Sequence, residues 1–133
     1  MSPARKYFNS IKPIRDAWIK EFCINSLCMG CRCYKKRLDC HEIERRSSAP
    51  KRFGDPCNYL ALCRNCHSFE FASMSHSRQL AFKKLFDLKN YNLRKWLSIK
   101  DPDLKAICRV TEDDVDSEVC FLLTRSKPGI ATR

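Results

Sequence analysis

The segment 58-NYLALCRNCH-67 decides the fold, because a short apolar run leads directly into a Cys-x-x-Cys pair and a histidine. Another Cys-x-x-Cys pair lies upstream: Cys28 and Cys31 form the first pair, or knuckle, along the chain, and Cys63 and Cys66 form the second. Each such turn brings two sulfur atoms toward one ion, and two turns make a closed tetrahedral site that is typical of structural zinc. We therefore expect these four cysteines to hold one structural Zn²⁺ ion.

Ten of the 133 residues are cysteine, which fits either a disulfide-stapled exported chain or an intracellular metal site. Residues 1–22 contain no apolar stretch of the signal-peptide type, so we expect an intracellular chain. No apolar run approaches the roughly 20 residues that span a bilayer, which predicts no membrane segment. The six cysteines outside the two pairs are Cys23, Cys33, Cys40, Cys57, Cys108 and Cys120. We expect them to be buried free thiols; Cys33 is an alternative ligand, and the first four are candidates for a second ion.

The charge of the chain is strongly positive and unevenly spread. The formal net charge is +11, and residues 1–52 carry 13 Lys or Arg against 5 acidic residues. Because such side chains neutralise phosphates and release counterions, the pattern predicts a nucleic-acid partner, DNA or RNA. The expected phosphate contacts are Lys35, Lys36, Arg37, Arg45, Arg46, Lys51 and Arg52.

The local pattern predicts short strands around the first knuckle and helices after the second. We expect a short helix over residues 16–22, a basic turn over 32–38, a strand over 38–43 and a long loop over 44–56. Residues 68–133 read as helical. The apolar stripe of the first helix there is Leu80, Phe82, Leu85, Phe86 and Leu88.

Two further helices are predicted by their caps. Asn92 precedes one apolar stripe and Thr111 precedes another, and both residue types cap helix N-termini. The side chains that we expect to face inward from the last helix are Val115, Val119, Leu122 and Leu123. His76 lies in a polar stretch, and we expect it to be solvated.

The order of residues between the knuckles resembles a known family. His41-Glu42-Ile43 follows the first Cys-x-x-Cys pair, and Asn58 begins the segment NYLALCRNCH, which is nearly a full match to the form N-L-x-x-L-C-x-x-C-H and ends at His67. This order resembles the HNH endonucleases of the ββα-metal (His-Me finger) type with zinc knuckles, and it is similar to small phage HNH proteins. The resemblance is specific over residues 28–67 and weaker to about residue 116.

The resemblance implies a hairpin and a helix around one catalytic divalent ion, Mg²⁺ or another. His41 falls on the family's first metal-ligand position and His67 on the last. Asn58 falls on the central Asn, which orients the base loop or joins the metal shell; a structural hydrogen bond is the alternative. The family's general base is a histidine, but Glu42 stands at that position here.

Two assignments of the general base therefore stay open. Glu42 accepts the proton if burial raises its pKa toward neutrality. Alternatively, His41 is the base and Asp39 or Glu42 supplies a ligand. Residues 39 and 41 share one face of a strand while residue 42 points to the other, which favours a pairing of Asp39 with His41.

The predicted fold class is small α+β, a zinc-stapled ββα unit followed by helices. We divide the chain into a basic arm (1–22), a zinc-knuckle HNH-like domain (23–75), a helical extension (76–125) and a tail (126–133). The predicted function is a metal-dependent endonuclease that hydrolyses DNA phosphodiester bonds with low sequence specificity, in the cytoplasm of a bacterium or phage-infected cell.

Two alternatives have a different chemistry. A non-catalytic zinc module of the same fold would bind nucleic acid, or regulate a polymerase, packaging or repair complex. A protein-only partner, such as an inhibitor that matches an acidic surface, would bind one protein tightly and generic DNA weakly.

Overall fold

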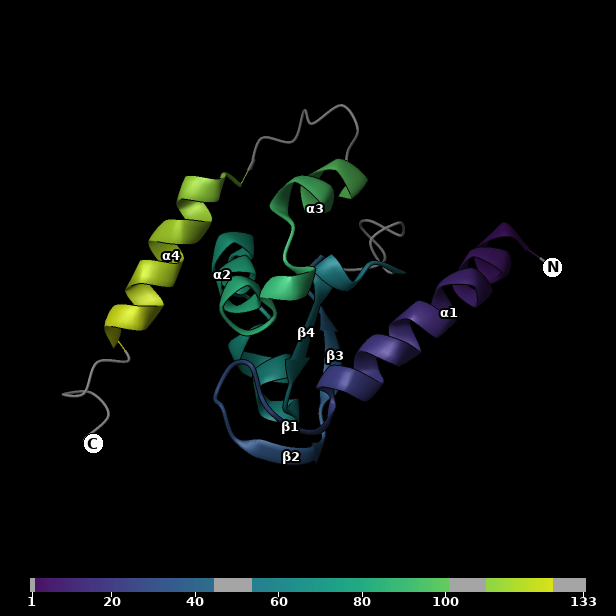
Figure 1. The fold of residues 1–133 in the computed structure, drawn as a ribbon, viewed down its shortest axis with the longest axis horizontal. Coiled ribbons are helices and arrows are strands. Elements are labelled where there is room, and N and C mark those ends of the chain that lie inside the picture. Colours follow the sequence, from purple (N-terminus) through teal and green to yellow (C-terminus); the bar gives the residue numbers. More distant parts are fainter. Residues whose placement is uncertain (1, 45–53, 101–109, 126–133) are drawn as a thin grey trace.

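The computed structural model describes residues 2–44, 54–100 and 110–125. The helices of these residues are α1 (Pro3–Phe22), α2 (His76–Phe86), α3 (Leu93–Lys100) and α4 (Glu112–Arg125). The strands are β1 (Ile24–Leu27), β2 (Tyr34–Arg37), β3 (Asp39–Glu42) and β4 (Tyr59–Leu62). Short helical turns occur at η2 (Pro56–Asn58), η3 (Cys66–Glu70) and η4 (Leu88–Asn90). The fold is α+β, as predicted (Figure 1).

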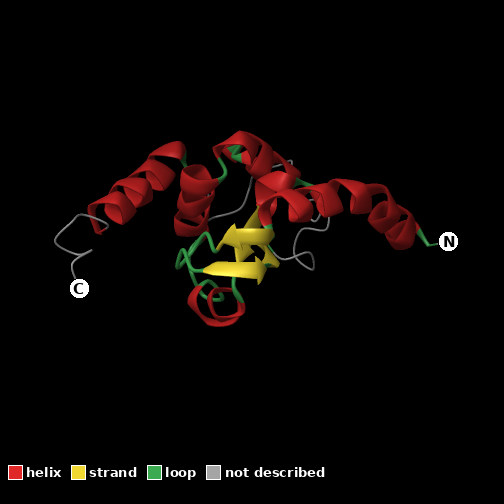
Figure 2. Ribbon diagram, turned by 60° about the horizontal axis from the view of Figure 1, so that its bottom comes forward, coloured by secondary structure: helices red, strands yellow, loops and turns green. Residues whose placement is uncertain are grey.

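The strands form two small antiparallel sheets, β1 with β2 and β3 with β4. In the second sheet His41 lies opposite Leu60 and Glu42 opposite Tyr59. Figure 2 shows the strands gathered at the centre, with helices around them. Because an isolated two-stranded sheet is only marginally stable in water, these hairpins depend on what packs against them.

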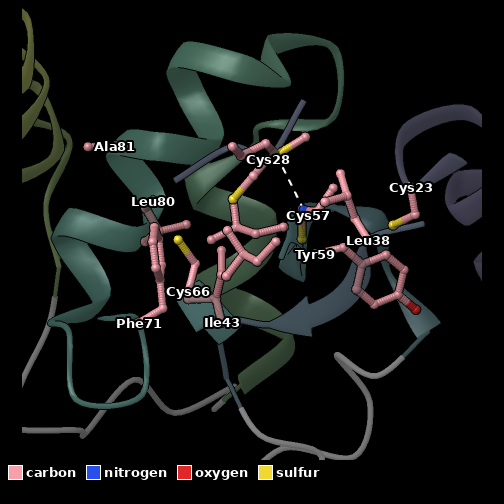
Figure 3. Close-up of a cluster of buried hydrophobic side chains, with 14 of the residues drawn as sticks. Cys23, Cys28, Leu38, Ile43, Cys57, Tyr59, Cys66, Phe71, Leu80 and Ala81 are labelled. Atoms are coloured by element: carbon pink, nitrogen blue, oxygen red, sulfur yellow. Dashed lines mark hydrogen bonds between the residues drawn. The ribbon is translucent and has the colours of Figure 1, made fainter. Parts of the chain in front are cut away.

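Strand β4 is the centre of the core. All four of its residues are fully buried, which is why this stretch reads as a continuous apolar run rather than an alternating one. Leu80 of α2, Phe71 and three of the four knuckle cysteines, Cys28, Cys63 and Cys66, pack in the same cluster. Figure 3 shows Cys23 and Cys66 at opposite ends of this core, so sulfur atoms are spread along it.

Helix α1 is anchored by a buried polar contact with α2. Trp18 Nε1 donates to Asp87 Oδ2 at 3.0 Å, and Lys83 Nζ donates to the same carboxylate and to the Tyr59 carbonyl at 2.6 Å each. The Lys83 and Asp87 side chains have no exposed surface. A buried charge needs such partners, because an unpaired one costs several kcal/mol.

The predicted caps are present. The Asn92 side chain accepts from Lys95 N at 2.9 Å, and Thr111 Oγ1 accepts from Asp114 N at 3.1 Å. Asp114 in turn accepts from the Thr111 backbone N–H, which completes a reciprocal cap at the start of α4. None of the described helices combines the length and the apolarity needed to cross a bilayer.

Two boundary predictions were wrong. The helix expected over residues 16–22 extends over all of α1, because Ile11 also lies on the buried face that Trp18 and Phe22 share. The basic turn expected over residues 32–38 is largely strand β2. All four β2 residues are exposed, so no alternation of apolar and polar residues marked this strand.

Three side chains are also placed differently from the prediction. Leu88 is 66% exposed because the chain has left α2 for η4, and Leu123 is 55% exposed on the flank of α4. His76 begins α2 and pairs with Glu44, with Nε2 at 3.0 Å from Oε2, rather than lying in a solvated loop.

Candidate metal centre and pocket

Four cysteines converge where the two hairpins meet η3. The Sγ atoms of Cys28, Cys31, Cys63 and Cys66 all lie within 4.8 Å of one another. Cys31 Sγ and Cys63 Sγ are 3.8 Å apart. Four sulfurs in a tetrahedron at about 2.3 Å from zinc are about 3.8 Å apart, so the arrangement fits this ion. The cluster can hold a metal ion such as zinc, as the spacing predicted.

The backbone of the knuckles is shaped for a thiolate. Cys28 Sγ accepts hydrogen bonds from the backbone N–H groups of Gly30 and Cys63, each at 3.3 Å. A Cβ on Gly30 would lie 2.6 Å from the Phe71 ring and 3.0 Å from Cys66 Sγ, so only glycine fits there. Arg32 turns the chain with a φ of 65°.

A cation is needed to keep these sulfurs ionised. Burial, followed by hydrogen bonding to Cys28, raises the pKa of the Cys66 thiol, and burial also raises the pKa of Cys31. Metals bind the thiolate form, so binding at this cluster releases protons and offsets the desolvation of the sulfurs. The donor set therefore fits a soft, thiolate-binding ion.

Among the described residues, the group whose ligand atoms lie close enough together to hold a metal ion is the four-cysteine cluster. The structure therefore does not support a second ion on the other cysteines. Cys33 Sγ lies 3.1 Å from Cys31 Sγ, beside the cluster. Cys23 and Cys57 are buried, and burial raises the pKa of each thiol to about 12. Cys108 lies outside the described residues.

A pocket of about 400 Å³ opens between β3, η3 and α2. Its lining residues are Cys40, His41, Glu42, Ile43, His67, Phe71, Ala72 and Gln79. Three of the four predicted catalytic residues, His41, Glu42 and His67, therefore share one pocket. His67 directly follows Cys66 of the four-cysteine cluster, so a metal ion bound there would fix the position of one pocket wall.

The two pocket histidines face each other. His41 Nδ1 and His67 Nδ1 are 2.9 Å apart, and the rings meet edge to face. The other ring nitrogen of His41, Nε2, is 2.8 Å from Gln79 Oε1. That separation is a hydrogen-bond distance, and an ion shared by the two rings would have to replace the proton between them.

The carboxylate that lines the pocket is Glu42 rather than Asp39. Asp39 Oδ2 is 2.9 Å from Arg64 Nε, in an ion pair outside the pocket lining. Glu42 is the last residue of β3, where the strand alternation ends, and it lines the pocket together with His41. The predicted pairing of Asp39 with His41 does not describe this pocket.

The Asn58 side chain makes hydrogen bonds inside the fold. It is fully buried; its Oδ1 accepts from Glu44 N at 2.8 Å and from Trp96 Nε1 at 2.9 Å, and its Nδ2 donates to Glu44 O at 2.9 Å. Asn58 does not line the pocket. It ties the backbone just after β3 to β4 and α3, which is the structural hydrogen-bonding role left open by the sequence.

The predicted phosphate contacts are only partly described. Lys35, Lys36 and Arg37 lie consecutively on β2 and are all exposed. The remaining four are Arg45, Arg46, Lys51 and Arg52, and they lie outside the described residues. Strand β2 thus presents three adjacent cations to solvent.

Two residues near the site were missed. Gln79 is 4% exposed and contacts His41. The feature of the sequence that could have indicated Gln79 is a polar residue within an apolar helix stripe, one turn before Phe82 and Lys83. Trp96, in the apolar stripe that follows Asn92, supplies a donor to Asn58.

Comparisons with protein-family models, with curated proteins and with solved structures gave no match for this chain. The cysteine cluster and the adjoining pocket are both formed by residues between Cys28 and Gln79.

Proposed function

We propose that this protein is a metal-dependent endonuclease of the HNH kind that hydrolyses DNA phosphodiester bonds. The observation that carries the proposal is the 2.9 Å approach of His41 Nδ1 and His67 Nδ1 in a pocket that Glu42 also lines. The chain order β3, β4, η3 supports it, since a hairpin followed by a short helix is the arrangement that the resemblance implies.

His41 and His67 would hold the catalytic divalent ion, Mg²⁺ or another. When bound, such an ion polarises a phosphoryl oxygen and stabilises the charge that develops on the leaving oxygen. Imidazole nitrogens suit transition ions such as Mn²⁺, Ni²⁺ or Zn²⁺, whereas Mg²⁺ prefers oxygen ligands. We therefore expect higher activity with Mn²⁺ or Ni²⁺ than with Mg²⁺.

Glu42 is the proposed general base. In this proposal Nδ1 of His41 would bind the ion, and Nε2 lies 2.8 Å from Gln79 Oε1, so neither ring nitrogen is left to accept a proton from water. Glu42 is the carboxylate among the pocket-lining residues, so it is placed to accept the proton of an attacking water. We therefore propose Glu42 as the base in preference to His41.

The cysteine cluster has a structural part in the proposal. Zinc bound there would join the β1–β2 turn to η3, and with it hold His67 against His41. The core of this region is too small to fix a hairpin rigidly without such a staple. Strand β2 would contribute Lys35, Lys36 and Arg37 to the phosphate backbone, which favours binding with low sequence specificity.

The test is nicking of supercoiled plasmid by zinc-loaded protein, with EDTA, Mg²⁺, Mn²⁺ and Ni²⁺ compared. We expect metal-dependent nicking that His41→Ala and His67→Ala abolish. Glu42→Gln should lower the rate about 10²–10⁴-fold, the usual contribution of a general base. Ser77→Ala, on α2 but outside the pocket lining, is the matched control and should cleave like the wild type.

A specific outcome would overturn the proposal. If no metal supports cleavage of any DNA form while one zinc per chain is retained, the chain is not a nuclease. The same holds if His41→Ala and His67→Ala proteins still cleave.

The exposed cations of β2 favour a second candidate, a non-catalytic zinc module that binds nucleic acid, alone or within a polymerase, packaging or repair complex. Under this candidate His41 and His67 form only a hydrogen bond inside the fold. It predicts salt-dependent binding of DNA or RNA without turnover, and binding is measured on the same zinc-loaded protein.

A further inference from the structure

Gln79 is a buried polar residue that no catalytic pattern in the sequence called for. It is 4% exposed and lies in the first turns of α2, which Ser75 caps. Its side chain makes two contacts: Nε2 donates to the Met74 carbonyl at 2.8 Å, and Oε1 lies 2.8 Å from His41 Nε2. Both ends of the amide are therefore committed.

The orientation of this amide follows from its partners. A carbonyl oxygen can only accept, so the NH₂ group of Gln79 must face Met74. The amide oxygen is then the atom that faces His41, and it too can only accept. His41 Nε2 must therefore carry the proton.

A neutral histidine carries one ring proton, so a proton on Nε2 leaves a lone pair on Nδ1. That is the nitrogen that lies 2.9 Å from His67 Nδ1 at the pocket wall. Gln79 thus selects which nitrogen of His41 is available to a metal. Such partners of ligating histidines fix both the tautomer and the direction of the ring.

We propose that Gln79 is a positioning residue, which holds His41 in the Nε2–H tautomer and aims its Nδ1 lone pair at a divalent ion shared with His67. The inference rests on the proposed function for the identity of the shared ion. The tautomer itself is independent of catalysis, because it is set by hydrogen bonds inside the apoprotein pocket.

The first test is the tautomer. Long-range ¹H–¹⁵N correlation spectra of zinc-loaded, ¹⁵N-histidine protein report which ring nitrogen is protonated, and three histidines are assigned by His→Ala variants. We expect His41 with Nε2–H and a bare Nδ1. A His41 with its proton on Nδ1 would overturn the proposal.

The second test is Ni²⁺ binding by calorimetry, with zinc content followed in parallel. Gln79→Met removes the acceptor and should weaken Ni²⁺ binding about 10–100-fold. Gln79→Glu keeps an acceptor for His41 but loses the bond to Met74, and it should bind Ni²⁺ within a few-fold of the wild type. Lys84→Met is the control for metal binding, because Lys84 lies outside the pocket lining and pairs with Glu112 and Asp116 of α4.

These variants separate positioning from simple stabilisation. Both Gln79 variants lose the donor to Met74, so both should lower the melting temperature, but only Gln79→Met should lower Ni²⁺ affinity. Equal losses of affinity in the two, or none in Gln79→Met, would contradict the proposal. If the tautomer and Ni²⁺ results hold while plasmid is not cleaved, the nuclease proposal fails and the positioning role stands.

Discussion

Asn58 stands at a position that the sequence resemblance associates with catalysis, yet it makes three hydrogen bonds inside the molecule. Two go to the backbone of Glu44 and one comes from Trp96. Because it lies outside the pocket lining, we expect its effect on the site to be indirect. It holds the chain segment that follows His41 and Glu42.

Replacing Asn58 by alanine should therefore destabilise the fold. Two buried donors, Glu44 N and Trp96 Nε1, and one buried acceptor, the Glu44 carbonyl, lose their partner, at about 1–3 kcal/mol for each group. Urea denaturation of zinc-loaded protein measures the change. Trp96→Phe removes one of the three bonds and should cost less; an Asn58→Ala protein as stable as the wild type would refute the structural role.

Cys57 should make stability fall in alkaline solution. Burial, followed by the neighbouring Asp55 carboxylate, raises the pKa of the folded-state thiol from 9.0 to about 12. The folded chain therefore keeps this proton over a range in which the unfolded chain releases it. The stabilisation of the folded state by the neutral Cys57 thiol is therefore complete below about pH 9. It is lost, at about 1.4 kcal/mol of unfolding free energy per pH unit, as the pH rises toward 12.

Denaturation of Cys57→Ala from pH 8 to pH 11 measures this contribution. The fall in unfolding free energy with pH should be shallower than in the wild type by up to that amount. Cys120→Ala is the control, because the Cys120 thiol is already exposed in the folded chain. Parallel curves for the wild type and Cys57→Ala would contradict the assignment.

Substitutions in strand β2 test the proposed binding of nucleic acid most directly. Lys35, Lys36 and Arg37 follow one another on this strand and are all exposed, with Lys36 on the opposite face from the other two. Changing all three to Gln should weaken DNA binding and lower the slope of log K against log salt by about 0.9 per lost phosphate contact.

A control variant with the same net charge separates this surface from charge in general. Lys12, Lys89 and Arg94 are exposed on α1, η4 and α3, and their change to Gln should leave the slope closer to that of the wild type. Equal effects of the two triple variants would contradict a binding role for β2. Fluorescence anisotropy with a labelled duplex measures both.

Some elements were predictable from sequence and others were not. The caps at Asn92 and Thr111 depend on local hydrogen bonds, so their residue types were sufficient. The four-cysteine cluster was predictable because Cys-x-x-Cys spacing itself carries the geometry. Gln79 was not, because its partner His41 is 38 residues away and belongs to another element.

The same reasoning explains the pocket. His41 and His67 were expected at one site only through the family resemblance, since nothing local brings them together. Strand alternation favoured Asp39 as a partner of His41, but that rule fails at the end of β3, where Glu42 joins the pocket and Asp39 pairs with Arg64. Long-range contacts decided both outcomes.

The molecule as a whole should depend on its zinc. Its sheets have two strands each, and the cysteine cluster joins the β1–β2 turn to the end of β4 and η3. Metal binding at such a site contributes directly to folding. A strong chelator should therefore abolish cooperative thermal unfolding and reduce the strand signal in circular dichroism.

Variants give the same test without a chelator. Cys63→Ser should lose zinc and fold poorly, whereas Cys120→Ser, at an exposed cysteine outside the cluster, should keep one zinc per chain. A zinc-free chain with the melting temperature of the loaded protein would show that the cluster is not a structural centre.

Anomalous diffraction from crystals of zinc-loaded protein soaked in Mn²⁺ bears most directly on the proposed two-metal organisation. We predict a zinc peak among the four cysteine sulfurs and a separate manganese peak bound by His41 Nδ1 and His67 Nδ1 in the pocket. A zinc peak alone, with the two nitrogens still 2.9 Å apart in a hydrogen bond, would contradict the catalytic site and leave the binding module as the function of this fold.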